Sequence, residues 1–160
     1  MKRNSLTTAV VAGIAGVAGF AGLANAVDLN PDGLGQVLIY PYYTVNGGQS
    51  TLFTVVNTAD IGKAVKVRFL EGYNSREVLD FNLFLSAHDV WTAAVTQTSD
   101  ATGGASIFTS DHSCTSPAIP AGGQPFLTAG FDGTGSNAGV TIPADDGPQD
   151  ITRTREGYAE

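Results

Sequence analysis

Within residues 34–97, apolar and polar residues alternate in short blocks that are separated by turn-forming residues. Val65, Val67 and Phe69 alternate with two basic residues, which predicts a strand with one face in water and the other against a core. From Leu79 to Leu85 every second residue is again apolar, and a helix would scatter these side chains around its surface. The pattern therefore predicts a strand in both segments.

Two further runs predict strands: Ser50–Asn57, which is apolar on both sides and rich in β-branched residues, and Val90–Thr96. Trp91 is the largest candidate for burial in the core. The run Gly35–Tyr40 precedes them, and Asn46-Gly47-Gly48 predicts a turn because Asn and Gly tolerate positive φ. No helical pattern separates these strands, which argues against a parallel βαβ arrangement. The sequence predicts an all-β fold, an antiparallel β-sandwich of the immunoglobulin-like class.

From residue 99 to residue 150 the chain is rich in Gly, Pro and Ser and keeps only short apolar pieces. This composition predicts a long loop or lobe, and loops of such length are uncommon unless they are functional. Residues 151–160 alternate again and predict a final strand. That strand is either an exposed edge guarded by Arg153 and Arg155, or part of a chain truncated at its C-terminus, with sheet partners downstream. We expect the second.

The first 26 residues predict a secretory signal peptide. Lys2 and Arg3 give a positive start, an uncharged apolar stretch follows, and Ala24-Asn25-Ala26 is a small-x-small cleavage site. The alternative is a transmembrane anchor, for which the apolar stretch is short and rich in Gly. Cleavage after Ala26 leaves one domain at residues 27–160 with no membrane span. The signal predicts export to the periplasm, the cell surface or the exterior.

Composition narrows the class of partner. The chain has 8 basic and 15 acidic side chains and a net charge of −7. Nucleic acids require clustered Lys and Arg, so we expect no nucleic-acid partner. With 42% apolar and 14% charged residues, the chain is not a disordered polyelectrolyte. An unknown protein or a polysaccharide is the expected partner.

Cys114 is the one cysteine of the chain. In an oxidising compartment an odd cysteine is a free thiol or is bonded to a cysteine elsewhere. We expect a disulfide whose partner lies outside this chain.

Several segments resemble a family of uncharacterised secreted bacterial proteins. The segments are Gly35–Thr44 (GQVLIYPYYT), Val65–Gly72 (VKVRFLEG), Ser75–Ser86 (SREVLDFNLFLS), Asp89–Thr92 (DVWT) and Arg155–Tyr158 (REGY). The resemblance spans most of the exported chain, and members of the family tend to be longer. It implies secretion and a chain that forms the N-terminal part of such a protein. The family has no established activity to carry over.

A candidate calcium loop lies just before the first strand. Asp28, Asn30 and Asp32, followed by Gly33, supply oxygen donors at alternate positions as in the first half of a calcium-binding loop. The position that should supply a bidentate Glu is Ile39. An Asx/Pro turn that opens the first strand explains the same residues. We expect no cofactor, with calcium at these three residues as the alternative.

Histidine and cysteine side chains give weak catalytic candidates. His88 and His112 are too few for a zinc site, and His88 suits a turn between two strands. Asp111-His112-Ser113-Cys114 places a histidine near a thiol, but the segment is part of the long loop, where a disulfide explains Cys114 more simply. We expect no catalytic residue among them.

Carboxylates and tyrosines offer two further sites. Paired acids of a glycosidase could come from Glu71, Glu77 and Asp80. Basic residues lie nearby at Lys66, Arg68 and Arg76. They predict a cross-strand salt-bridge face instead of a catalytic pair. A platform for sugar stacking would use Tyr40, Tyr42 and Tyr43, for which we expect core and edge packing around Pro41.

The sequence therefore predicts a secreted, non-enzymatic β-sandwich that serves as an interaction or structural module of the bacterial cell envelope or exterior. Binding is expected in the 99–150 loop, because loops on a rigid sandwich carry recognition. The alternatives are a calcium-assisted carbohydrate-binding module and the N-terminal part of a secreted hydrolase.

Overall fold

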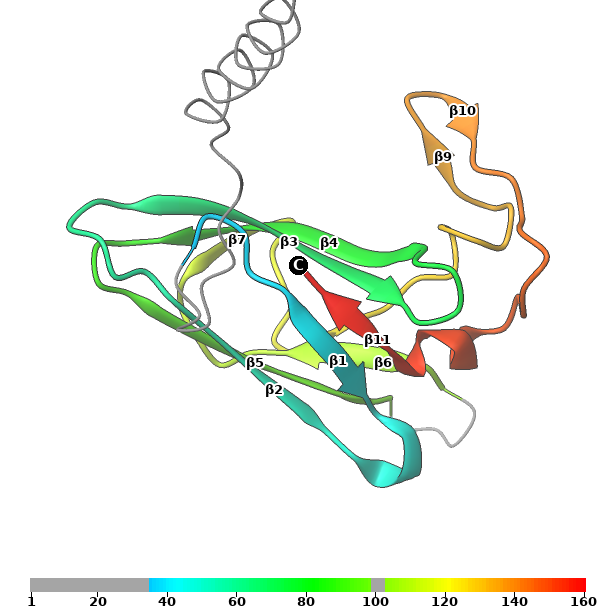
Figure 1. The fold of residues 1–160 in the computed structure, drawn as a ribbon, viewed down its shortest axis with the longest axis horizontal. Helices are drawn as coiled ribbons and strands as arrows, with labels where there is room; N and C mark the ends of the chain where they lie inside the picture. Colours follow the sequence, from blue (N-terminus) through cyan, green and yellow to red (C-terminus); the bar gives the residue numbers. More distant parts are fainter. Residues whose placement is uncertain (1–34, 99–102) are drawn as a thin grey trace, which may run out of the picture. The chain divides into compact units, whose positions relative to one another are not determined.

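Two antiparallel sheets form the layers of the fold (Figure 1). The computed structural model describes residues 35–98 and 103–160. Sheet A has the order β1-β11-β3-β4-β7, with β1 (Tyr40–Thr44), β11 (Glu156–Ala159), β3 (Lys63–Glu71), β4 (Glu77–Leu85) and β7 (Cys114–Ser116). Sheet B has the order β2-β5-β6-β8, with β2 (Thr51–Val56), β5 (Val90–Gln97), β6 (Ala105–Phe108) and β8 (Gln124–Pro125).

Four small elements complete the described chain. The strands β9 (Ser136–Asn137) and β10 (Val140–Thr141) pair only with each other and form a separate hairpin, orange in Figure 1. The 3₁₀ helix η1 (Asn46–Gly48) joins β1 to β2, and η2 (Ile151–Arg155) precedes β11.

Alternation along the strands builds the core between the sheets. In β4, Phe81, Leu83 and Leu85 are buried, whereas Asn82 and Phe84 point outward. Sheet B contributes side chains such as Phe53, Trp91, Val95 and Ile107, and the Trp91 ring lies 5.7 Å from that of Phe81. The predicted antiparallel β-sandwich is confirmed, and Trp91 is a core residue as expected.

The segment 99–150 is more regular than a single loop. Its described part contains β6, β7, β8, β9 and β10. The apolar pair Ile107-Phe108 belongs to β6, which pairs with β5 in sheet B. The prediction of a long Gly/Pro/Ser-rich excursion applies best to residues 126–150, where the hairpin is the only regular structure.

The last strand is shorter than predicted and lies inside a sheet. Residues 151–155 form η2, because Asp150 caps its first turn by accepting a hydrogen bond from the Thr152 N–H. β11 then enters sheet A between β1 and β3. The expectation that its sheet partners lie downstream is therefore wrong, and so is the alternative of an exposed edge strand.

Candidate functional site

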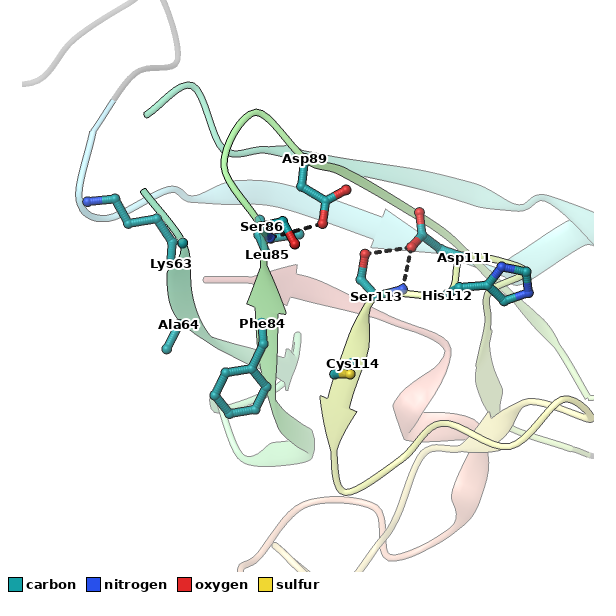
Figure 2. Close-up of a pocket in the computed structure, with 11 residues that line it drawn as sticks. Lys63, Ala64, Phe84, Leu85, Ser86, Asp89, Asp111, His112, Ser113 and Cys114 are labelled. Carbon is teal, nitrogen blue, oxygen red and sulfur yellow. Dashed lines mark hydrogen bonds between the residues drawn. The ribbon is translucent and has the colours of Figure 1, made fainter. Parts of the chain in front are cut away.

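A surface pocket gathers several of the candidate chemical groups (Figure 2). It has a volume of about 730 Å³ and lies where β3, β4 and the start of β7 meet. Asp111, His112, Ser113 and Cys114 line it together with Asp89 and Lys63. The sequence motif around Cys114 thus does border a cavity.

The geometry inside this pocket is that of a turn. Asp111 Oδ1 accepts hydrogen bonds from the Ser113 N–H at 2.8 Å and from the Ser113 hydroxyl at 2.6 Å. The hydroxyl hydrogen bond from Ser113 is the main reason why the pKa of Asp111 lies below its ordinary value. In Figure 2 the His112 ring points away from Cys114. A thiol–imidazole pair is therefore not assembled, and Cys114 is an exposed free thiol.

His88 lies in a turn, as predicted. Its backbone has φ of 56°, in the turn between β4 and β5, and its Nε2 atom lies 2.7 Å from Asp60 Oδ1. Asp89 instead accepts a hydrogen bond from the Ser86 N–H at 3.0 Å. The two histidines occupy separate places, and the part of the chain described here holds no group of three or more potential metal ligands.

The three candidate glycosidase carboxylates are separated by the sheet. On the outward face of sheet A, Asp80 pairs with Lys66, and Glu77 pairs with Arg68 at 2.9 Å. The predicted cross-strand salt-bridge face is thus confirmed for these two acids. Glu71 is different, because its side chain is fully buried. The paired-acid site is not formed.

Glu71 belongs to a buried ion cluster that we define as Glu71, Asp145 and Arg153. Arg153 Nε lies 3.0 Å from Glu71 Oε2, and Arg153 Nη1 lies 2.7 Å from Asp145 Oδ1. The guanidinium also lies over the Phe131 ring, 4.2 Å from its centroid. The cluster joins the end of β3, the 126–150 segment and η2.

Hydrogen bonds keep the cluster ionised. Burial raises the pKa of Glu71, but hydrogen bonds from Arg153 and from backbone N–H groups outweigh burial and leave this pKa below its ordinary value. The hydrogen bond from Arg153 is also the largest cause of the lowered pKa of Asp145. The same hydrogen bonds raise the pKa of Arg153. An ion cluster whose charges are paired in this way holds segments together rather than offering a reactive acid.

The three tyrosines do not form a platform. Tyr43 is buried, and Tyr40 packs against the core while its hydroxyl donates to the Thr54 carbonyl at 2.5 Å. Tyr42 is 58% exposed and donates a hydrogen bond to Glu156 at 3.0 Å. The expectation of core and edge packing holds for Tyr40 and Tyr43, which both reach the core although they are three positions apart, because the register of β1 shifts between them.

The outward face of sheet B carries several exposed apolar side chains. Leu52, Thr54 and Val56 of β2 stand opposite Ala94, Thr92 and Val90 of β5. We call these six residues the neutral face, because β2, β5, β6 and β8 contain no charged residue. Leu52 is 78% exposed, Val56 50% and Val90 46%. Contiguous exposed apolar side chains on one sheet are typical of an interaction surface.

Sequence reasoning missed the neutral face and the pairing of Arg153 with Glu71 and Asp145 in the ion cluster. The signal for the face was present, since Ser50–Asn57 and Val90–Thr96 are uncharged on both sides. The cluster gave no comparable signal, because Asp145 lies in the irregular segment and Arg153 lies 82 positions after Glu71.

Three expectations from the sequence lie outside the described residues. They are the signal peptide at residues 1–26, its cleavage site, and the calcium loop of Asp28, Asn30 and Asp32. Within residues 35–98 and 103–160, no helix has the length and apolar character needed to cross a membrane.

No protein-family model matches the chain, and no match was found among curated proteins or solved structures. The resemblance to secreted bacterial proteins stays a prediction.

Proposed function

We propose that this chain is an exported, non-enzymatic interaction module of the bacterial cell envelope or exterior, and that it binds a partner protein through the neutral face. The observation that supports this most is the exposure of Leu52 between Thr54 and Ala94 on a sheet without charge. An aliphatic side chain that is largely in water on a rigid sheet gains about 1.5–3 kcal/mol when a partner covers it.

The candidate catalytic groups support the same conclusion. Asp111 is engaged by Ser113, His88 by Asp60, and Glu71 by Arg153. Each of these polar groups has a local partner that stabilises a turn or a junction. The non-enzymatic part of the proposal would be contradicted if the purified protein hydrolysed an ester or a polysaccharide and lost this activity in His88→Ala or His112→Ala.

The binding surface can be tested without knowing the partner. A photo-crosslinking amino acid is placed at Thr54, in the centre of the neutral face, and in a matched variant at Asn82, on the outward face of sheet A. Both proteins are expressed in a producing bacterium and irradiated. We expect a covalent adduct from position 54, and its loss when Leu52→Lys is added. No adduct from position 54, or equal yield from position 82, contradicts the proposal.

Export is tested separately on the same material. The mature protein is expected to begin at Val27, because cleavage follows Ala26. Mass spectrometry of the protein recovered outside the inner membrane measures this directly. A protein that retains residues 1–26 in the cytoplasm would contradict the exported location while leaving the crosslinking result intact.

A further inference from the structure

The two edges of β4 are covered to different extents. On one side β3 pairs with β4 from Lys63 opposite Leu85 to Leu70 opposite Glu77. On the other side β7 pairs only with Asn82, Leu83 and Phe84. About half of this second edge therefore extends past the end of β7.

The register shows which backbone groups occupy the uncovered edge. Arg68 exchanges both backbone hydrogen bonds with Glu160, so the neighbours of Arg68 along β3 face β4. Their partners Leu79 and Phe81 face β3, and Asp80 between them directs its N–H and C=O toward the β7 side. Neither group has a hydrogen-bond partner within residues 35–98 and 103–160.

Both ends of the uncovered stretch are defined. At one end β7 stops at Ser116, and Pro117, whose ring fixes its φ, follows directly. At the other end the Val78 carbonyl accepts a hydrogen bond from the Leu127 N–H at 2.8 Å. The Asp80 N–H and C=O lie between these two points.

A groove lies along this stretch. It has a volume of about 640 Å³, and one wall is β4 while the other includes the base of the β9–β10 hairpin. Its apolar lining comes from Leu79, Phe81, Ile119, Leu127 and Ile142. A volume in the range of ligand pockets, with apolar walls and a backbone donor and acceptor, suits a short extended segment.

Charge restricts the occupant further. The ionised side chains at the rim are already paired: Glu77 with Arg68, Asp80 with Lys66, and Arg76 with Asp145. The groove therefore offers no uncompensated charge, and a charged ligand would lose hydration there without gaining a partner. The complementary ligand is an uncharged peptide.

We propose that this groove binds an extended, uncharged peptide segment of a partner protein, which pairs with the Asp80 backbone and continues the line of β7. The added strand would exchange two hydrogen bonds with Asp80 and place alternate side chains against Leu127 and Ile142. This site is distinct from the neutral face and goes beyond the function proposed for it.

The test uses the full chain and a capped heptapeptide of alternating threonine and valine as the probe. Nuclear magnetic resonance follows the backbone amides during the titration. We expect the Asp80 amide to shift and its hydrogen exchange to slow by at least about tenfold at saturation, because the amide acquires an acceptor. The Arg68 amide, already bonded to Glu160, is the internal reference and should not change.

Two pairs of variants locate the site. Leu127→Asp or Ile142→Asp should weaken binding by at least about tenfold, since each buries a carboxylate against the peptide. Val140→Asp, on the same hairpin but outside the groove, is the matched control and should bind normally. Asp80→Pro removes the N–H and should abolish binding, whereas Asp80→Asn keeps the backbone and should retain it.

The results that overturn the proposal are equally specific. They are no binding at millimolar peptide, an unprotected Asp80 amide at saturation, or equal affinity in Leu127→Asp and Val140→Asp. Loss of peptide binding in Leu52→Lys would show that the peptide binds to the neutral face and not to the groove. If Asp80→Pro fails to fold, the Leu127 and Val140 pair still decides the question.

Discussion

The outward faces of the two sheets differ in charge although both belong to one sandwich. Sheet A carries Lys66, Arg68, Glu77 and Asp80 in cross-strand pairs, whereas the neutral face of sheet B consists of aliphatic and threonine side chains. Both faces obey the same alternation, so strand formation does not require the difference. Charge on the solvent side is how strands ordinarily avoid unwanted contacts. Its absence from the neutral face supports the proposal that a partner covers this surface.

The contrast extends to the interior. Sheet A has one buried ionised side chain in the described chain, Glu71, which pairs with Arg153 near Asp145. The inward side chains of sheet B are apolar. Exposed ion pairs contribute little to stability, but breaking a buried pair leaves an uncompensated charge. Charge in sheet A therefore serves solubility on the outside and attachment of the 126–150 segment on the inside.

The largest expected effect compares Arg153 of η2, which pairs with the buried Glu71, with Arg68 on the outward face of β3. Arg153→Met leaves Glu71 buried without its cation and should reduce the free energy of unfolding by about 3–5 kcal/mol. Arg68→Met removes an exposed cation and should change it by no more than about 1 kcal/mol. Urea denaturation of both variants measures the difference. Equal losses would mean that the buried cluster is no more important than the surface pairs.

A smaller effect should follow acidification. The pKa of Glu71 is below its ordinary value of 4.5 in the folded chain, so the folded state binds fewer protons than the unfolded state. Stability from this group is therefore complete above pH 4.5 and is lost as the pH falls toward the folded pKa. Thermal unfolding across this range should show a fall in Tm that is shallower in Glu71→Gln. A pH-independent Tm would exclude the ionised cluster.

The third comparison concerns the open edge of β2. Sheet B protects this edge from pairing with other strands without using charged side chains. The Tyr40 hydroxyl donates a hydrogen bond to the Thr54 carbonyl, and the Thr51 hydroxyl donates one to the Thr44 carbonyl. Tyr40→Phe should reduce stability by about 0.5–1.5 kcal/mol and free an acceptor on the edge. Sedimentation velocity should then detect more self-association than in wild type. An unchanged sedimentation profile would show that Tyr40 does not protect the edge.

The smallest effect is expected from giving sheet B the character of sheet A. Thr54 and Thr92 are cross-strand partners, so the double substitution Thr54→Lys and Thr92→Glu introduces an exposed ion pair. Stability should change by less than about 0.5 kcal/mol, because both positions face solvent in the free protein. Chemical denaturation provides the measurement. A large loss would mean that the neutral face is covered within the isolated chain.

Much of the fold was predictable because the strands obey period two. Leu79, Phe81, Leu83 and Leu85 alternate without interruption, and the structure buries all four. Residues 151–155 were misassigned because Ile151, Arg153 and Arg155 alternate too, and the Asp150 cap that starts η2 is a single-residue signal. Sheet order was not predictable, since alternation does not specify which strand lies beside β11.

The candidate sites were predictable only where chemistry was local. His88 in a turn and the Lys66–Asp80 pair follow from neighbouring residues or one hairpin. The Glu71–Arg153 pair and the groove at Asp80 depend on segments that are distant in sequence and meet only in the folded chain. Residue types alone cannot indicate such meetings.

The central place of β11 in sheet A has a consequence for how the chain folds. Among the described residues, β1 joins sheet A through β11 alone, and the hydrogen bond between Tyr42 and Glu156 spans 114 positions. Contacts of high sequence separation slow folding, because a long loop must close before they form. Sheet A therefore cannot be completed while residues 156–159 are still being synthesised. A nascent chain of this topology therefore keeps β1 without its sheet A neighbour until residues 156–159 have emerged from the ribosome.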